Sequence, residues 1–289
     1  MNLYSKARIL MVATAVLWSL GGVLIKLVEW NALAIAGMRS FIAAIVILIY
    51  LKKPKITWSK PQIGGAVAYA FVMIFFVAAT KLTTAANAAL LQYTSPIYIG
   101  IFSYFFLKEK ITRVDWASIA LVFIGMILFF FDDLSFESFL GNFLGMMNGL
   151  SFAIMVMMLR KQKDSSPIES VFLGNILAGL ITLPFMFQSM PSAMSWVGLI
   201  LLGSIQLGLP YVFYTNAVKH LSALESSLIP VIEPLLNPIW VVIFVGEIPG
   251  MWTFIGGSLV IGGVVGRYFL NAKRMKQKKQ INREDESDS

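Results

Sequence analysis

The sequence predicts an all-α integral membrane protein with ten transmembrane helices arranged as two inverted five-helix repeats. Its composition, the number of its apolar runs and an internal repeat predict this class. Of the 289 residues, 58% are hydrophobic and only 13% are charged, whereas about 25% of a typical soluble domain is charged. A soluble fold could not bury so much apolar surface, so the composition excludes a cytosolic enzyme and a disordered chain. With no cysteine, the chain has no disulfide framework and no thiolate metal site.

Ten apolar runs have about the 20 residues that a helix needs to cross a bilayer. They cover residues 7–28, 32–51, 61–80, 84–106, 114–131, 139–159, 168–188, 195–217, 222–245 and 251–270. Short connections leave no room for a separate soluble domain. The polar residues 271–289 are expected to form a disordered cytoplasmic tail.

The basic residues predict the topology. With the N-terminus inside the cell, 20 of the 23 Lys and Arg fall on the cytoplasmic side, Lys81 falls outside, and Lys26 and Arg39 fall within spans. This bias follows the positive-inside rule and places both termini in the cytoplasm. Because the charges lie in short gaps between apolar runs, no nucleic-acid partner is expected. The lack of cysteine and of an organelle signal favours a bacterial or archaeal inner membrane.

An internal repeat relates the two halves, residues 1–135 and 136–270. When the chain is shifted by 138 residues, residues 75–125 align with 213–263 without a gap, and 12 of the 51 positions are identical. Each half holds five predicted spans, an odd number, so the two halves must run in opposite directions across the membrane. Inverted repeats are typical of alternating-access transporters, which bind their substrate near the midplane between the halves.

Short motifs recur in order along both halves. The first half contains Trp18-Ser19, Gly37-Met38-Arg39, Ala88-Ala89-Leu90-Leu91, Pro96 and Leu107-Lys108-Glu109; the second contains Ala223-Leu224-Glu225, Glu233-Pro234, Gly246-Glu247, Gly256-Gly257 and Gly262-Gly263. Through these motifs the chain resembles the EamA-like branch of the drug/metabolite transporter superfamily over about residues 7–270. The resemblance implies a ten-helix bundle with a central cavity that exports or takes up small metabolites, and it leaves the substrate open.

Glu233 is the strongest candidate site residue, because it lies near the middle of an apolar run. Burying a carboxylate at that depth costs about 3 kcal/mol or more. Glu233 either binds a substrate amine, carries a proton, or ties two helices together as a hydrogen-bonded carboxyl. Asn237 follows one turn later, on nearly the same helix face.

Four prolines are hinge candidates: Pro96, Pro230, Pro234 and Pro238. A proline has no N–H, so each should free the carbonyl four residues earlier, and a carbonyl freed at membrane depth needs a partner. A bend that serves gating and a simple packing kink both remain open.

Further candidates line the same region. Arg39 could bind a substrate carboxylate, snorkel to the interface or pair with a glutamate, and the structural alternatives are slightly favoured. Trp18 is expected to form an aromatic cavity wall or to pack in the core. Polar groups in other spans also qualify for the path or for helix-to-helix hydrogen bonds: Gln92, Tyr93, Asn148, Tyr211, Tyr214 and Asn216.

Two further sets of residues are interpreted as structural. Glu109 and Glu247 precede predicted helices, whose positive N-terminal ends suit a carboxylate. Glycines at spacing four, namely Gly141, Gly145 and Gly149 in one span and Gly262 and Gly266 in another, predict close helix packing, with a dimer face as the alternative.

The predicted function is secondary transport of small metabolites such as amino acids or amines. The expected partners are the substrate, membrane lipid and protons as a coupling ion, without a cofactor, in a monomer or homodimer. An intramembrane hydrolase is disfavoured because the single histidine, His220, is peripheral and cysteine is absent. A channel or a membrane assembly protein remains the alternative.

Overall fold

A computed structural model of the chain describes residues 2–26, 28–83, 85–131, 134, 137–245 and 250–287. Within these ranges the regular structure is entirely helical, which confirms the all-α class. The helices in chain order are α1 (Leu3–Trp18), α2 (Gly21–Lys26), α3 (Ala32–Leu51), α4 (Lys60–Leu82), α5 (Ala85–Gln92), α6 (Ser95–Leu107), α7 (Arg113–Phe129), α8 (Phe139–Lys161), α9 (Ile168–Met186), α10 (Ala193–Leu201), η2 (Leu202–Gly208), α11 (Leu209–Val218), α12 (Ala223–Leu228), η3 (Ile229–Val231), α13 (Ile232–Val245) and α14 (Met251–Ser287).

Seven helical stretches in the described ranges are long and apolar enough to cross a membrane. They are Ala32–Leu51, Lys60–Thr80, Ala86–Leu107, Phe139–Lys161, Ile168–Met186, Ala193–Val218 and Met251–Leu270. The other three predicted runs are shorter or interrupted: α7 has 17 residues, and breaks divide residues 7–28 and 222–245. The protein is therefore a multi-pass membrane protein, and the number of ten spans stays a prediction.

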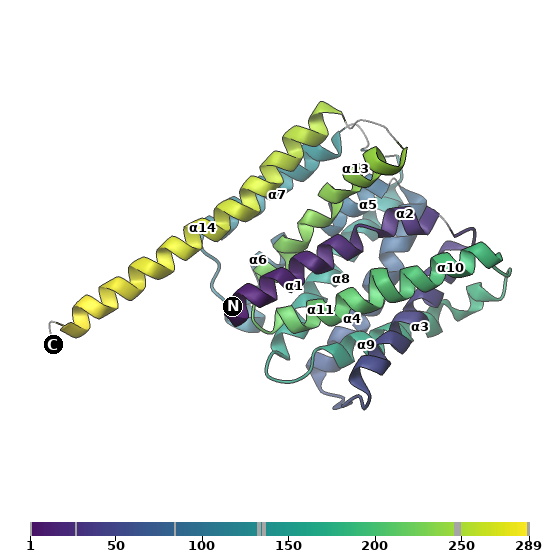
Figure 1. Ribbon diagram of the computed structural model, residues 1–289, viewed down its shortest axis with the longest axis horizontal. Helices are drawn as coiled ribbons and strands as arrows, with labels where there is room; N and C mark the ends of the chain where they lie inside the picture. The colour runs from purple at the N-terminus through teal and green to yellow at the C-terminus, as the bar shows by residue number, and fades with distance from the viewer. Residues whose placement is uncertain are drawn as a thin grey trace.

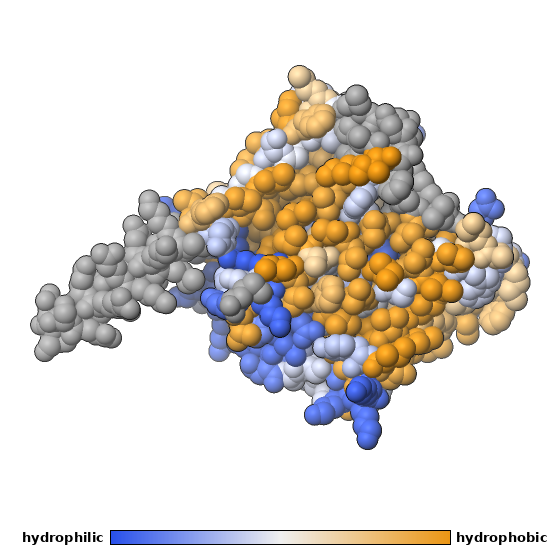
Figure 2. All heavy atoms as spheres, viewed as in Figure 1, coloured by the Kyte–Doolittle hydropathy of each residue, from blue (hydrophilic) through white to orange (hydrophobic). Residues whose placement is uncertain are grey.

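The surface supports a membrane location. Large apolar side chains such as Ile49 and Phe105 are more than two-thirds exposed, at 71% and 76%. Figure 2 shows that apolar residues cover the flank of the bundle, whereas hydrophilic residues gather at the end near the N-terminus. A soluble monomer rarely exposes so extended an apolar surface, and a bilayer would cover it.

Helices distant in sequence pack side by side in the bundle (Figure 1). α4 packs against α8 and α9, α3 against α9, α1 against α11, and α7 against α14. The glycines of α8 allow close packing, as predicted: a Cβ added to Gly149 would lie 2.5 Å from the Leu91 carbonyl oxygen, and one on Gly141 would lie 2.7 Å from the backbone of Leu82.

The glycines of α14 differ from the prediction. Among the described residues, nothing lies within 4 Å of a Cβ added to Gly262 or Gly266, so these two glycines do not bring two described helices together. α14 instead approaches α7 closely through Gly256, whose added Cβ would meet the backbone of Gly125 and Phe129. The two open glycines lie on another face of the helix.

The C-terminal segment also differs from the expected disordered tail. α14 continues from its apolar part to Ser287, and Figure 1 shows it extending away from the bundle. The physical reason lies in the composition, because residues 267–287 contain no glycine or proline and are rich in Lys, Arg and Gln, which favour helix.

Several membrane-length segments are interrupted. α1 ends at Trp18, and Trp240 Nε1 on α13 donates to Ser19 Oγ at 2.9 Å in the gap before α2. α5 ends at Gln92, just before Pro96 in the first turn of α6. Pro230 lies in the short 3-10 turn η3, and the π-helical segment η2 separates α10 from α11. Trp18, Gln92 and Gln206, which lie at or within these interruptions, line a common cavity.

Candidate functional site

A buried cavity lies where the interrupted segments meet. Its volume is about 50 Å³, which is room for a few water molecules, since one water needs about 10–15 Å³. Five predicted binding residues line it: Trp18, Arg39, Gln92, Tyr211 and Glu233. They come from five different helices, so the fold gathers residues up to 215 positions apart in sequence.

Arg39 is buried in the wall of this cavity. It is the eighth residue of α3, about 10 Å from the start of that helix, and only 3% of its surface is exposed. Within the described chain no carboxylate lies within 4.0 Å of its guanidinium, and its Nε has no hydrogen-bond partner. The side chain thus neither snorkels nor forms the ion pair that the sequence interpretation slightly favoured. A buried charge without a partner is destabilising by several kcal/mol.

Glu233 reaches the cavity from the first turn of α13, where Tyr93 holds its carboxyl group. Tyr93 Oη lies 2.7 Å from Glu233 Oε2 and 3.2 Å from the carbonyl oxygen of Pro230. That carbonyl is one that Pro234 leaves without its helical N–H. Tyr93 does not line the cavity itself; it positions the residue that does.

A second freed carbonyl also has a tyrosine partner. The Tyr214 hydroxyl donates to the Ser226 carbonyl at 3.1 Å, and Pro230 is the residue that frees this group. The expectation that freed carbonyls find partners is therefore confirmed at two positions. Pro96 stands at a helix break, as expected of an interruption, and its role as a hinge stays a prediction.

Aromatic rings form one side of the site. The ring of Trp18 lies 5.1 Å from Tyr211, 5.5 Å from Tyr214 and 6.3 Å from Phe152, measured between centroids. These distances are typical of favourable ring pairs. The indole Nε1 of Trp18 is buried and has no acceptor among the described residues, so the aromatic wall carries one unused donor.

Only some of the predicted amide side chains line the cavity. Asn148 on α8 is fully buried and donates to Gln92 Oε1 at 2.8 Å, so it orients a lining residue without lining the cavity. Asn216 bonds instead to Tyr50 and to the Val212 carbonyl, away from the cavity. The side chains of Asn237 and Pro238 lie outside the described residues, although both positions belong to α13.

Sequence reasoning missed Gln206, which enters the cavity from the π-helical segment η2. Its Nε2 donates to the Trp18 carbonyl at 3.3 Å, while its buried Oε1 has no partner in the described structure. Single π-turns are frequent at functional sites. The signal was present, because Gln206 is an amide within an apolar run, as Gln92 is.

A second hollow lies toward the opposite end from the N-terminus. It has a volume of about 440 Å³ and is lined by the start of α3, including Asn31 and Leu33, and by Ala78 and Leu82 near the end of α4. α3 and α4 also line the buried cavity, through Arg39 and residues 72–76. Helices α3 and α4 therefore contribute lining residues to both the cavity and the second hollow.

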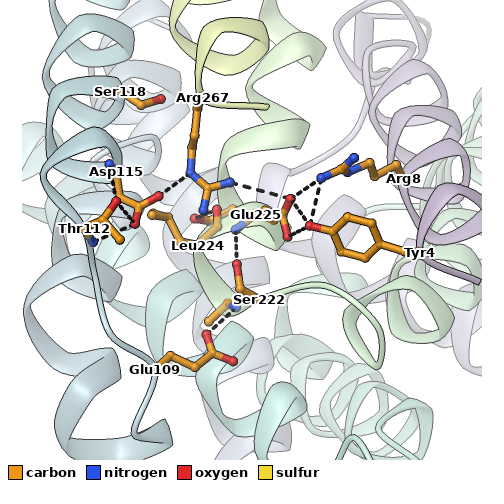
Figure 3. A network of polar contacts seen from close by, with 12 residues as sticks. Tyr4, Arg8, Glu109, Thr112, Asp115, Ser118, Ser222, Leu224, Glu225 and Arg267 are labelled. Carbon is orange, nitrogen blue, oxygen red and sulfur yellow. Dashed lines mark hydrogen bonds and ion pairs between the residues drawn. The ribbon is translucent and has the colours of Figure 1, made fainter. Parts of the chain in front are cut away.

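A polar network joins helices at the N-terminal end of the bundle (Figure 3). Its centre is Glu225 on α12: Arg8 Nη2 lies 2.8 Å from Oε1, the Tyr4 hydroxyl donates at 2.6 Å, and Arg267 Nη1 lies 3.7 Å away. Burial and the adjacent carboxylate raise the pKa of Tyr4 to about 12, so its hydroxyl remains a donor at physiological pH. We call Tyr4, Arg8, Asp115, Glu225 and Arg267 the Glu225 network.

Arg267 extends the Glu225 network from α14 to α7. Its Nε lies 2.8 Å from Asp115 Oδ1, and the other oxygen of Asp115 accepts from the Thr112 backbone at 2.7 Å in a capping box that begins α7. The four helices α1, α7, α12 and α14 therefore meet at this end through four charged side chains, Arg8, Asp115, Glu225 and Arg267.

The hydrogen-bond partner of Glu109 differs from the predicted one. It was expected at the N-terminus of the next helix, α7, but it accepts from the backbone N of Ala223 at the start of α12, at 2.9 Å. Arg160 Nε also donates to it at 2.9 Å. The reason is that Asp115 already caps α7. Glu247, the equivalent residue in the second half, lies outside the described residues.

In the described part of the chain, no group of three His, Asp or Glu side chains is placed to hold a metal ion. The fold and the site define a class: a multi-pass helical membrane protein with a small cavity between its helices, lined by charged, amide, aromatic and aliphatic side chains. The sequence matches the model of the EamA-like transporter family twice, over residues 5–131 and 139–269, and the chain belongs to that family. This confirms the resemblance to drug/metabolite transporters and supports the division into two repeats.

The relatives carry transporter names. An uncharacterized transporter of Archaeoglobus fulgidus is 26% identical over 91% of this chain and 95% of its own length. The pseudopaline exporter CntI of Pseudomonas aeruginosa is 25% identical over 80% and 84%, and mouse solute carrier family 35 member G1 is 26% identical over 91% and 79%. Among solved structures, one crystal structure that is similar in fold has a TM-score of 0.78 and 18% identity over 92% of this chain and 98% of that one.

Proposed function

We propose that the protein is a secondary transporter that exports small metabolites, such as amino acids or amines, by alternating access. It crosses the cytoplasmic membrane ten times as two inverted five-helix repeats with both termini in the cytoplasm, as a monomer or homodimer. The buried cavity that contains Arg39 and Glu233 is the observation that carries this proposal. Charged groups at membrane depth are costly and mark transport paths.

The two ends of the bundle support alternating access. The Glu225 network joins helices at the N-terminal end, while the larger hollow lies toward the other end. Such an arrangement fits a conformation that is closed at the cytoplasmic side. Because the cavity holds only about 50 Å³, a solute requires the helices around it to separate.

In the proposed cycle, the charge state of Glu233 controls which side of the protein is open. A carboxyl that is held by a phenol and faces a cavity can change its protonation, or bind a substrate amine, when the cavity opens. Either event changes the charge at the point where both halves meet. Protons are therefore the proposed coupling ion.

Flux in proteoliposomes tests the proposal. The purified protein should catalyse saturable uptake and counterflow of a labelled solute, identified first by its protection against thermal unfolding. Glu233→Gln should lower the rate and flatten its pH dependence. Glu29→Gln, which changes an exposed carboxylate away from the cavity, is the matched control and should behave as wild type.

Three results would contradict the proposal or one of its parts. Non-saturable flux without counterflow would indicate a channel. A complete lack of flux for every solute that binds would favour a membrane assembly protein. An unchanged rate and pH profile in Glu233→Gln would remove the assigned role of that residue.

A further inference from the structure

Among the described residues, Arg39 has no carboxylate partner. Its surface is 3% exposed, it lines the cavity, and its Nε is unbonded among the residues described. A structural arginine at this depth would be expected to have a carboxylate or carbonyl partner. The structure thus contains a strong anion-binding group that is not paired with any described carboxylate.

A second donor lies in the same wall. The indole N–H of Trp18 is buried and has no acceptor in the described chain, and Trp18 lines the same cavity as Arg39. Neither a guanidinium nor an indole N–H can accept a hydrogen bond. Both groups therefore need a ligand that accepts, and a carboxylate offers two oxygens to such a pair, in the forked geometry that guanidinium prefers.

The protein's own carboxylate does not fill this role. Glu233 lines the cavity, but its Oε2 accepts from Tyr93 at 2.7 Å, and it is not within 4.0 Å of Arg39. Together with the unbonded Oε1 of Gln206, Glu233 supplies acceptors. The cavity thus has donors and acceptors at different points of its wall, with aromatic rings between them.

We infer that Arg39 binds the carboxylate of the transported solute, so that the substrate is an organic acid such as an amino acid and not a simple amine. This inference rests on the proposed transport function and narrows its substrate class. The carboxylate accepts from Arg39 and Trp18, and a cationic or hydroxyl group of the same molecule donates to Glu233 or Gln206. The aromatic side chains pack against the carbon skeleton.

A matched ligand panel tests the substrate class on the full-length protein in detergent. The panel contains amino acids and hydroxy acids, the amide of each acid, and the amine or alcohol that lacks the carboxyl group. Thermal unfolding is measured with each compound, because a ligand that binds the folded state raises the midpoint. At least one acid should stabilise the wild type, and its amide and its decarboxylated form should not.

Substitutions at Arg39 test the residue. Arg39→Gln should weaken binding of the protecting acid about 10-fold to 100-fold, the range expected for a lost charged hydrogen bond, and Arg39→Lys should retain part of it. Without ligand, Arg39→Met should unfold at the same temperature as the wild type or higher, because it removes an unpaired buried charge. A structural arginine would give the opposite result, a lower unfolding midpoint for Arg39→Met.

The outcomes separate the inference from the proposed function. Protection and saturable flux with amines, but not with acids, would overturn the inference and leave the transporter proposal intact. Equal binding of an acid to the wild type and to a folded Arg39→Gln would also overturn it. An absence of protection and flux with every compound would overturn both.

Discussion

At the scale of single residues, the Tyr93 hydroxyl is the group that fixes Glu233. Tyr93→Phe removes the 2.7 Å hydrogen bond to the carboxyl and the contact with the Pro230 carbonyl. Loss of a buried hydrogen bond of this kind costs roughly 1–3 kcal/mol, so we expect a thermal midpoint lower by a few degrees and slower flux. Tyr98→Phe is the matched control, since no hydrogen bond of the Tyr98 hydroxyl is found in the described structure. Equal effects of the two variants would contradict the assigned role.

A pair of glycine variants tests helix packing at the same scale. A Cβ at Gly149 would lie 2.5 Å from the Leu91 carbonyl oxygen, and a backbone atom cannot rotate away. We expect Gly149→Ala to lower the free energy of unfolding by about 1–3 kcal/mol. Gly262→Ala, where nothing lies within 4 Å, should be neutral or slightly stabilising. Unfolding midpoints in detergent measure both, and equal destabilisation would show that Gly262 is packed in the native protein.

At the scale of helices, the Glu225 network connects α1, α12, α14 and α7 at one end. Glu225→Gln keeps the shape of the side chain but removes the charge that Arg8 and Arg267 contact. We expect this end to open more often. Because the chain has no cysteine, a single Val72→Cys in the cavity wall reports access, and its labelling by an impermeant maleimide from the cytoplasmic side should increase several-fold.

Asp164→Asn is the control for that experiment. Asp164 is an exposed carboxylate in the α8–α9 connection and is not part of the Glu225 network. It should leave labelling of the reporter cysteine unchanged. If Glu225→Gln also leaves labelling unchanged, the network stabilises the fold without controlling access.

From the sequence, the site could be predicted only where the type of a single residue was informative without knowledge of its neighbours in space. Glu233 stands out as a carboxylate in an apolar run, and the helix breaks at Pro96 and Pro230 follow from the missing N–H. The π-helical segment η2 contains no proline, so local rules did not predict it. The Glu225 network was missed because Tyr4 and Glu225 are 221 residues apart and each resembles an ordinary helix-end residue.

Gly149 of α8 contacts another helix whereas Gly262 of α14 contacts none among the described residues, and one cause explains both results. Spacing at four residues indicates a face on which helices could meet, but it does not say which helix is present to meet it. α8 lies inside the bundle, so Gly149 is in contact, whereas α14 packs at the edge through Gly256 and leaves Gly262 open. Burial is decided by the arrangement of the whole chain, which the pattern within one helix does not contain.

At the scale of the whole molecule, the alignment of the two halves predicts their relative orientation in the membrane. The shift of 138 residues aligns Leu82, at the end of α4, with His220, which follows α11. If the repeats are inverted, these equivalent positions lie on opposite sides of the membrane, with Leu82 outside and His220 in the cytoplasm. Both side chains are exposed, so each position can report its side.

Single cysteines placed in the cysteine-free chain measure this directly. In intact cells, an impermeant maleimide should label Leu82→Cys, and it should label His220→Cys only after the membrane is permeabilised. The reason is the charge bias, since an inverted arrangement keeps nearly all Lys and Arg on one side. Labelling of both positions from the same side would show that the repeats are parallel, and the shared midplane site would then need another explanation.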